Sequence, residues 1–253
     1  MTTQRIALIT GGNRGLGRAS AIALARSGVD IVLTYRSNAQ EAADVVDSIT
    51  ALGRSAFALR LDTTAFADFD RFTAELGEAL TAGWGRADFD ILVNNAGFAL
   101  PTPPGAATAD AIDRLMAVHF KGVVLLTQSL VPLIVDGGRI LNVSTGLTRF
   151  YGQGLSMYAA AKGAVEVYTR YLAEELGPRR ISVNAIAPGA TATDFGGGMV
   201  RDSDAARAAL SSVTARGRVG EADDIGGVVA ALLGEATGWM TAQRIEASGG
   251  QRL

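Results

Sequence analysis

The sequence contains no cysteine and only one histidine, His119, among its 253 residues. Without cysteine the chain cannot form disulfide bonds, thiol nucleophiles or cysteine-bound metal sites, and one histidine cannot build a zinc site alone. We therefore expect no metal. Any redox chemistry must come from a bound organic cofactor.

An excess of either charge is also missing. The chain has 23 basic and 25 acidic residues, interspersed, so no basic stripe indicates nucleic acid or an anionic membrane. The N-terminus runs into an apolar strand pattern without a signal-peptide layout, and no apolar run reaches the length of a membrane span. We expect a cytoplasmic protein without nucleic-acid or membrane partners.

Short apolar runs alternate with helical patterns along the chain, and its 48% hydrophobic content is ample for one continuous core. This alternation predicts the α/β class, with a parallel, doubly wound sheet in one domain over 1–253. Residues 194–215 are polar, glycine-rich at their start and weakly periodic, which indicates a flexible lid. The expected strands are 6–10, 30–35, 56–61, 89–93, 138–143, 181–186 and 243–247, and one or two helices are expected over 110–135.

A glycine-rich stretch, 11–17, lies between the first apolar run and the first helical pattern. Glycines at such a turn let the backbone approach a pyrophosphate, and the free N–H groups of the following helix favour an anion. The spacing G-x-x-x-G-x-G departs from the strict dinucleotide fingerprint, so a glycine-rich turn without a ligand is the alternative. The candidate cofactor-binding residues are Gly11, Asn13, Arg14, Gly15, Leu16 and Gly17.

The second predicted strand ends in Tyr35, Arg36 and Ser37, with no acidic residue. An Asp or Glu there would bind the ribose 2′-hydroxyl of NAD, whereas arginine beside a hydroxyl suits the 2′-phosphate of NADP. This pattern favours NADPH, with Arg14 as a second cation. NADH is the alternative if Arg36 is only a solvated loop residue. The adenine-side candidates at the end of the third strand are Asp62 and Thr63.

Tyr158 and Lys162 stand four residues apart in the stretch M-Y-A-A-A-K, so they share one face of a helix. A tyrosine has an ordinary pKa of about 10, and a neighbouring ammonium group favours the phenolate and lowers that value. The pair can therefore act as a general acid/base. The alternative is a solvated polar pair, against which the order of the surrounding segments argues.

Together, these segments make the chain resemble the classical short-chain dehydrogenase/reductases from end to end, including 3-oxoacyl-carrier-protein reductase-like and sugar dehydrogenase-like members. The motifs are T-G-G-N-R-G-L-G at 10–17, Asp62, N-N-A-G at 94–97, Y-A-A-A-K at 158–162 and P-G-A-T-A-T at 188–193. The resemblance implies a Rossmann-type domain with seven parallel strands and helices on both faces, usually a homotetramer or homodimer. It also implies hydride transfer between a nicotinamide and an alcohol or carbonyl.

By position, the resemblance implies that Tyr158 protonates a substrate carbonyl while Lys162 lowers its pKa and holds the nicotinamide ribose. The residues implied to fix the carboxamide are Pro188, Gly189, Thr191 and Thr193. Those implied for the adenine-side wall and strand support are Asn94, Ala96 and Gly97.

Two positions depart from the family pattern. The family places a serine thirteen residues before its tyrosine, and this chain has Thr145 there, preceded by Ser144. Threonine offers the same hydroxyl with a stiffer side chain. The family also has an asparagine where this chain has His119, the fourth member of the usual catalytic set. A satisfied structural histidine is the alternative to a catalytic one.

The leading hypothesis is an NADPH-dependent carbonyl reductase acting on a small-molecule ketone. An NAD-dependent alcohol or sugar dehydrogenase is one alternative, and a nucleotide-binding sensor or scaffold with reduced catalysis is another. Apolar residues expected near the cleft favour an apolar or aromatic substrate, unless they pack a lid or a subunit interface. These residues are Phe98, Leu100, Leu147, Phe150, Tyr151, Leu155, Phe195 and Met199.

Overall fold

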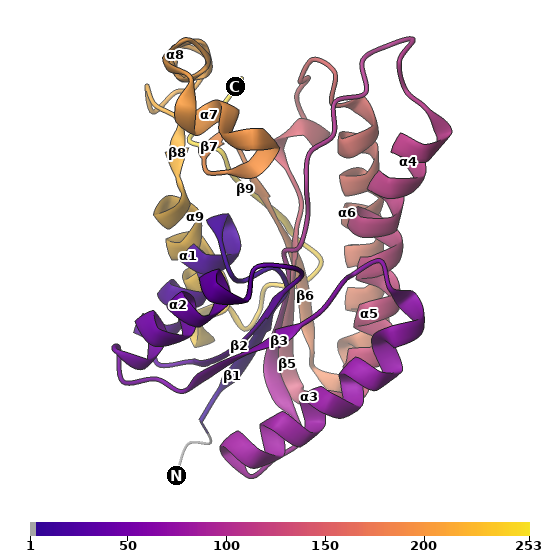
Figure 1. The fold of residues 1–253 in the computed structure, drawn as a ribbon, viewed down its shortest axis with the longest axis vertical. Coiled ribbons are helices and arrows are strands. Elements are labelled where there is room, and N and C mark those ends of the chain that lie inside the picture. The colour runs from indigo at the N-terminus through magenta and orange to yellow at the C-terminus, as the bar shows by residue number, and fades with distance from the viewer. Residues whose placement is uncertain (1–3) are drawn as a thin grey trace.

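Seven parallel strands form the central sheet in the computed structural model, which describes residues 4–253 (Figure 1). Their order is β3-β2-β1-β4-β5-β6-β9, so the winding direction reverses between β1 and β4. The predicted sheet is confirmed, and ligands in such folds bind beyond the carboxyl ends of the strands at this reversal. The strands are β1 Ile6–Ile9, β2 Asp30–Tyr35, β3 Ala56–Arg60, β4 Phe89–Asn94, β5 Ile134–Val143, β6 Ser182–Pro188 and β9 Arg244–Ala247.

Helices cover both faces of the sheet, because alternate strand residues point to opposite sides. In β1, Ala7 and Ile9 join the core under one group of helices, while Ile6 and Leu8 join the core under the other. The first group is α1 Gly15–Arg26, α2 Ala39–Thr50 and α9 Ala222–Leu232. The second is α3 Phe69–Trp84, α4 Ala109–Met116, α5 Gly122–Leu130 and α6 Ser156–Leu176 (Figure 1).

A π-helix, Ala117–Lys121, joins α4 to α5, so that Ala109–Leu133 is one continuous helical segment. By length and composition it is apolar enough to cross a membrane. The expectation that no apolar run reaches that length is therefore wrong, because the π-helix continues one helix into the next. Leu126 and Leu130 on this segment pack into the core beside the sheet.

The chain leaves the sheet after β6 and forms a small excursion at the top of Figure 1. There β7 Thr191–Ala192 pairs in parallel with β8 Gly220–Glu221. Between them lie α7 Met199–Asp202 and α8 Asp204–Ser211, so the expected lid carries regular structure. Strands of two residues are too short to leave a sequence pattern. The 3-10 turns are Phe66–Asp68, Val131–Leu133, Gly146–Thr148, Gly177–Arg179, Phe195–Gly198 and Glu235–Thr237.

Candidate active site

The glycine-rich turn between β1 and α1 is built for close backbone approach. Gly11 has a φ of +62°, which favours glycine. A Cβ at Gly17 would collide with the carbonyl oxygen of Gly11 and lie 2.5 Å from Nδ2 of Asn95. Within residues 4–253 no side chain caps the first turn of α1, so its amides can bind an anion. The turn therefore fits a pyrophosphate.

Hydrogen bonds from Thr10 and Asn95 hold this turn, and sequence reasoning missed both residues. Asn95 Nδ2 donates to the carbonyl oxygens of Thr10 and Gly11 at 2.8 and 3.1 Å. The Thr10 hydroxyl accepts from the amides of Asn95 and Ala96 at 2.9 and 3.0 Å. The N-N-A-G motif indicates that an asparagine lies at this position, but it does not show which of the two contacts the glycine-rich turn.

The side chain of Asn94 has the strand-support role that the resemblance implies. Its buried Nδ2 donates to Thr127 Oγ1 and Asn142 Oδ1, both at 2.9 Å, so its side chain supports the sheet interior. Two other turn residues also have side chains engaged elsewhere. Asn13 Nδ2 donates to Glu41 at 2.7 Å, and Leu16 packs against the core, so both can serve a phosphate only through their backbone amides.

The carboxyl ends of β2 and β3 place two arginines side by side. Tyr35 is paired with Arg60 in the sheet register, and Arg60 Nε donates to the Arg36 carbonyl at 3.2 Å. Burial alone would raise the pKa of Asp62. The hydrogen bonds from Thr64 and the charges of Arg36 and Arg60 outweigh burial, so the pKa is lowered overall. Arg36 and its neighbour Ser37 are exposed, and Thr63 follows Asp62 against the amino end of α5. Positive charge thus lies where the 2′-phosphate is expected.

The guanidinium of Arg14, predicted as a second cation for the 2′-phosphate, forms an ion pair of 2.7 Å with Asp194 of the lid. The same contact brings the lid against the glycine-rich turn: a Cβ at Gly15 would lie 3.4 Å from Asp194 and 3.8 Å from Thr193. Arg14 therefore joins the two walls of the cleft.

Residues 188–193 form the wall opposite the glycine-rich turn. Pro188 ends β6, and a Cβ at Gly189 would lie 2.8 Å from Ser248. The hydroxyl of Thr191 donates to the Gly189 carbonyl, and that of Thr193 accepts from the Phe195 amide. Gln251, which sequence reasoning missed, accepts from the Ala190 amide at 2.9 Å.

Helix α6 places Tyr158 and Lys162 together, both buried. Burial raises the pKa of Tyr158 above its ordinary range, and a hydrogen bond with Thr145 lowers it only in part. The expectation that Lys162 pulls this pKa down is wrong for this structure. The ammonium donates to the Val143 carbonyl at 2.6 Å, and burial lowers its own pKa to about 8.

The structure brings Thr145, rather than Ser144, to Tyr158. Thr145 is extended, with φ −157° and ψ 150°, and its hydroxyl also accepts from the Leu147 amide at 3.3 Å. Successive residues of extended chain point to opposite sides. The Ser144 hydroxyl instead donates to Glu166 at 2.6 Å. The thirteen-residue offset therefore identified the hydroxyl that contacts the tyrosine.

His119 lies inside the π-helix and is fully buried. Its Nε2 is 2.7 Å from the Phe98 carbonyl and 3.4 Å from the Phe98 amide, and the shorter contact favours the ring proton on Nε2, while Nδ1 has no partner within residues 4–253. Burial, followed by the charge of Lys162, lowers the pKa of His119 to about 3. The ring is therefore neutral. A Cβ at Gly97 would lie 2.7 Å from this ring, so the imidazole fits only because residue 97 is a glycine without a side chain.

Aromatic rings surround the tyrosine. The Phe195 ring lies 5.8 Å from that of Tyr158, and His119 packs edge-on against Tyr158 at 5.0 Å. Phe98 lies 5.5 Å from His119 on the other side. Phe195 is 43% exposed, so this side of the site offers apolar surface to a ligand.

Comparison with known proteins gives matches over nearly the whole chain. The family model described as enoyl-(acyl carrier protein) reductase matches residues 11–252. Tetrahydroxynaphthalene reductase PfmaG of Pestalotiopsis fici is 30% identical over 97% of this chain and 91% of its own length. Short-chain dehydrogenase/reductase FrzI of Cladobotryum sp. is 34% identical over 97% of this chain and 95% of its own.

Two solved ketoreductases have the same fold. LugOII, a promiscuous reductase that catalyses keto-reduction at C1 during lugdunomycin biosynthesis, is 39% identical with a TM-score of 0.93 over 99% of both chains. The angucycline C-6 ketoreductase LanV, solved with bound NADP, is 38% identical with a TM-score of 0.92, over 98% of this chain and 95% of its own. The chain therefore belongs to the short-chain dehydrogenase/reductase family and is an oxidoreductase.

Proposed function

We propose that this protein uses NADPH to reduce the ketone of a fused-ring aromatic compound to an alcohol. The observation that carries the proposal is the buried Tyr158 phenol, held by Thr145 beside Lys162 and flanked by the ring of Phe195. Relatives support this substrate class. LanV has been solved with NADP and rabelomycin, and PfmaG is a tetrahydroxynaphthalene reductase.

The Tyr158 phenol is protonated at neutral pH, as a general acid requires, and its raised pKa makes it a weaker acid than free tyrosine. The Thr145 hydroxyl, next to the phenol, donates to the same carbonyl oxygen and orients it. NADPH would supply the hydride, with the pyrophosphate at the turn of 11–17 and the 2′-phosphate at Arg36. Reduction then adds the hydride to carbon and the Tyr158 proton to oxygen, so atoms and charge balance.

After proton transfer, Lys162, one turn further along α6, would supply a replacement proton. Its pKa of about 8 lies close enough to neutrality for the ammonium to give up a proton. His119 does not serve as this source, because its pKa of about 3 keeps it neutral. We therefore assign His119 a packing role beside Tyr158 and Phe98.

The test compares classes of ketone with the purified protein. NADPH consumption should be fastest with a fused-ring aromatic ketone and at least tenfold slower with an aliphatic ketone or a 3-oxoacyl thioester, at equal concentration. The tenfold figure corresponds to about 1.4 kcal/mol of extra transition-state binding by the aromatic wall. Phe195→Ala should remove this preference without affecting NADPH binding. Faster turnover of the thioester would favour an acyl-chain reductase instead.

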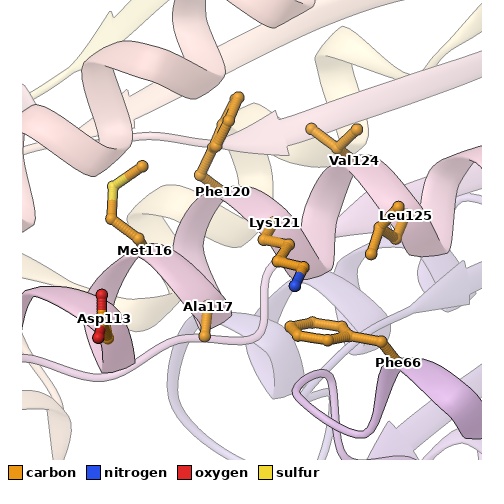
Figure 2. A pocket seen from close by; sticks show the side chains of 8 residues that line it. All are labelled: Phe66, Asp113, Met116, Ala117, Phe120, Lys121, Val124 and Leu125. Carbon is orange, nitrogen blue, oxygen red and sulfur yellow. The ribbon is translucent and has the colours of Figure 1, made fainter. Parts of the chain in front are cut away.

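We also propose that the protein is a homo-oligomer. Val167 and Tyr171 on α6 are exposed, and a groove of about 520 Å³ lies on the outer side of α4 and α5. Figure 2 shows this groove with Lys121 above the Phe66 ring, 4.4 Å from its centre. Its lining residues are Phe66, Asp113, Met116, Ala117, Phe120, Lys121, Val124 and Leu125. Light scattering should give the mass of a dimer or tetramer, and Tyr171→Glu should reduce it.

A further inference from the structure

One face of α6 contacts three consecutive residues at the carboxyl end of β5, Val143, Ser144 and Thr145. Tyr158, Lys162 and Glu166 recur every four residues and therefore form one row along the helix. Tyr158 contacts Thr145, and the Lys162 ammonium donates to the Val143 carbonyl. Glu166 accepts from the hydroxyl between them, that of Ser144, at 2.6 Å. Glu166 thus adds a third contact between α6 and residues 143–145.

Glu166 is paired with Arg244 of β9, an edge strand far away in sequence. Arg244 Nε lies 2.8 Å from Glu166 Oε1, and the Glu166 side chain is only 13% exposed. The same carboxylate oxygen accepts from the Thr148 hydroxyl at 2.8 Å. Arg244 also donates to the Thr145 carbonyl at 3.3 Å. The ion pair of Glu166 and Arg244 therefore holds both the Ser144 hydroxyl and the Thr145 carbonyl.

This arrangement decides which of two adjacent hydroxyls contacts Tyr158. Ser144 and Thr145 carry the same chemical group and point to opposite sides of extended chain, so a one-residue shift of the chain would exchange their sides. The hydrogen bond from Ser144 to Glu166 holds the serine hydroxyl on the side away from Tyr158. The bond from Arg244 to the Thr145 carbonyl holds the next peptide, between Thr145 and Gly146, and so resists such a shift.

We propose that Glu166 and Arg244 are positioning residues that select Thr145 over Ser144 as the substrate-orienting hydroxyl. The inference rests on the proposed ketone reduction for its kinetic consequence, but its structural consequence is independent of turnover. Arg244 keeps a second partner in Glu246, at 3.1 Å, so removal of Glu166 does not leave its charge unpaired. The variant should therefore fold.

The test uses Glu166→Ala, Ser144→Ala and the double variant, with the exposed Glu174→Gln on the same helix as a control. Glu166→Ala should lower kcat at least tenfold without changing the Kd for NADPH, because a misplaced donor to the developing oxyanion typically costs about 10²-fold to 10³-fold. Ser144→Ala and Glu174→Gln should be near wild type. The double variant should regain part of kcat, because the competing hydroxyl is gone; a purely structural brace predicts no rescue.

A crystal structure of Glu166→Ala separates this inference from the proposed function. The Thr145 hydroxyl should have left Tyr158, or the Ser144 hydroxyl should have replaced it. An unchanged contact between Thr145 and Tyr158 overturns the positioning role whatever the kinetics. Wild-type protein that reduces no ketone overturns the proposed function, while the crystal structure still decides this inference.

Discussion

Acid should destabilise the wild-type protein more than His119→Asn, because His119 is buried in its neutral form. Its pKa in the folded protein is about 3, whereas an unfolded histidine has an ordinary value of about 6.5. Between these two values the unfolded chain binds a proton that the folded protein does not. The contribution of neutral His119 to the free energy of unfolding is therefore fully present above pH 6.5 and is lost progressively as the pH falls toward 3.

The magnitude follows from the two pKa values. At pH 5 the unfolded state gains about 2 kcal/mol from protonating this side chain, compared with about 0.2 kcal/mol at pH 7. For a chain of this size, about 2 kcal/mol corresponds to roughly 4 to 8 °C in Tm. Asparagine cannot titrate, so His119→Asn lacks this contribution while all other titrating groups are unchanged.

The assay is a thermal melt of both proteins at pH 7 and pH 5. The fall in Tm between the two pH values should be roughly 4 to 8 °C larger for the wild type than for His119→Asn. Equal falls would show that His119 has an ordinary pKa and is not buried neutral. In kinetics, His119 should add no ionisation to the kcat profile between pH 5 and 8. Such a limb, if lost in His119→Asn, would make the imidazole a proton carrier.

Three further predictions concern the cofactor and the substrate hydroxyl. Arg36→Asp should weaken NADPH binding about tenfold to a hundredfold by calorimetry, since charge-assisted bonds are worth about 1.5 to 3 kcal/mol. Arg14→Ala should have a smaller effect, because Arg14 is already paired with Asp194. Equal losses of affinity would show that both arginines bind the 2′-phosphate. Thr145→Val should lose about 10²-fold to 10³-fold in kcat while Thr145→Ser stays active, and a fully active Thr145→Val would remove the hydroxyl from the mechanism. Gly17→Ala should abolish NADPH binding because its Cβ would collide with the Gly11 carbonyl, and retained affinity would contradict the close approach of backbone and pyrophosphate.

The strands were predictable because each is a short apolar run ending in a polar or glycine-rich turn. The sheet confirms this pattern, and β5 begins earlier than expected, at Ile134, because Asp136 and two glycines interrupt its apolar pattern. The strands β7 and β8 were missed, since two residues carry no period. The π-helix around His119 was missed as well, because nothing in the local sequence distinguishes it from an α-helix.

The site residues were predictable where a motif fixes a backbone position and less so where a side chain chooses a partner. Tyr158 contacts Thr145 as the resemblance implies, and Tyr158 and Lys162 are both buried on α6, as their spacing predicts. Arg14 and Asn94 hold motif positions, but the side chain of Arg14 pairs with Asp194, and that of Asn94 donates to Thr127 and Asn142. The contacts that redirect them come from distant parts of the chain, which no local spacing reveals.

The central claim, that Tyr158 is the proton donor in an NADPH-dependent ketone reduction, is tested most directly by single-turnover kinetics of wild type and Tyr158→Phe. Saturating fused-ring aromatic ketone is mixed with the NADPH-bound protein, and loss of the reduced nicotinamide and formation of alcohol are followed together. The wild type should form one alcohol per NADPH consumed, and Tyr158→Phe should bind NADPH normally while its rate falls at least about 10²-fold. A Tyr158→Phe rate close to that of the wild type, with the same one-to-one product, would contradict the account.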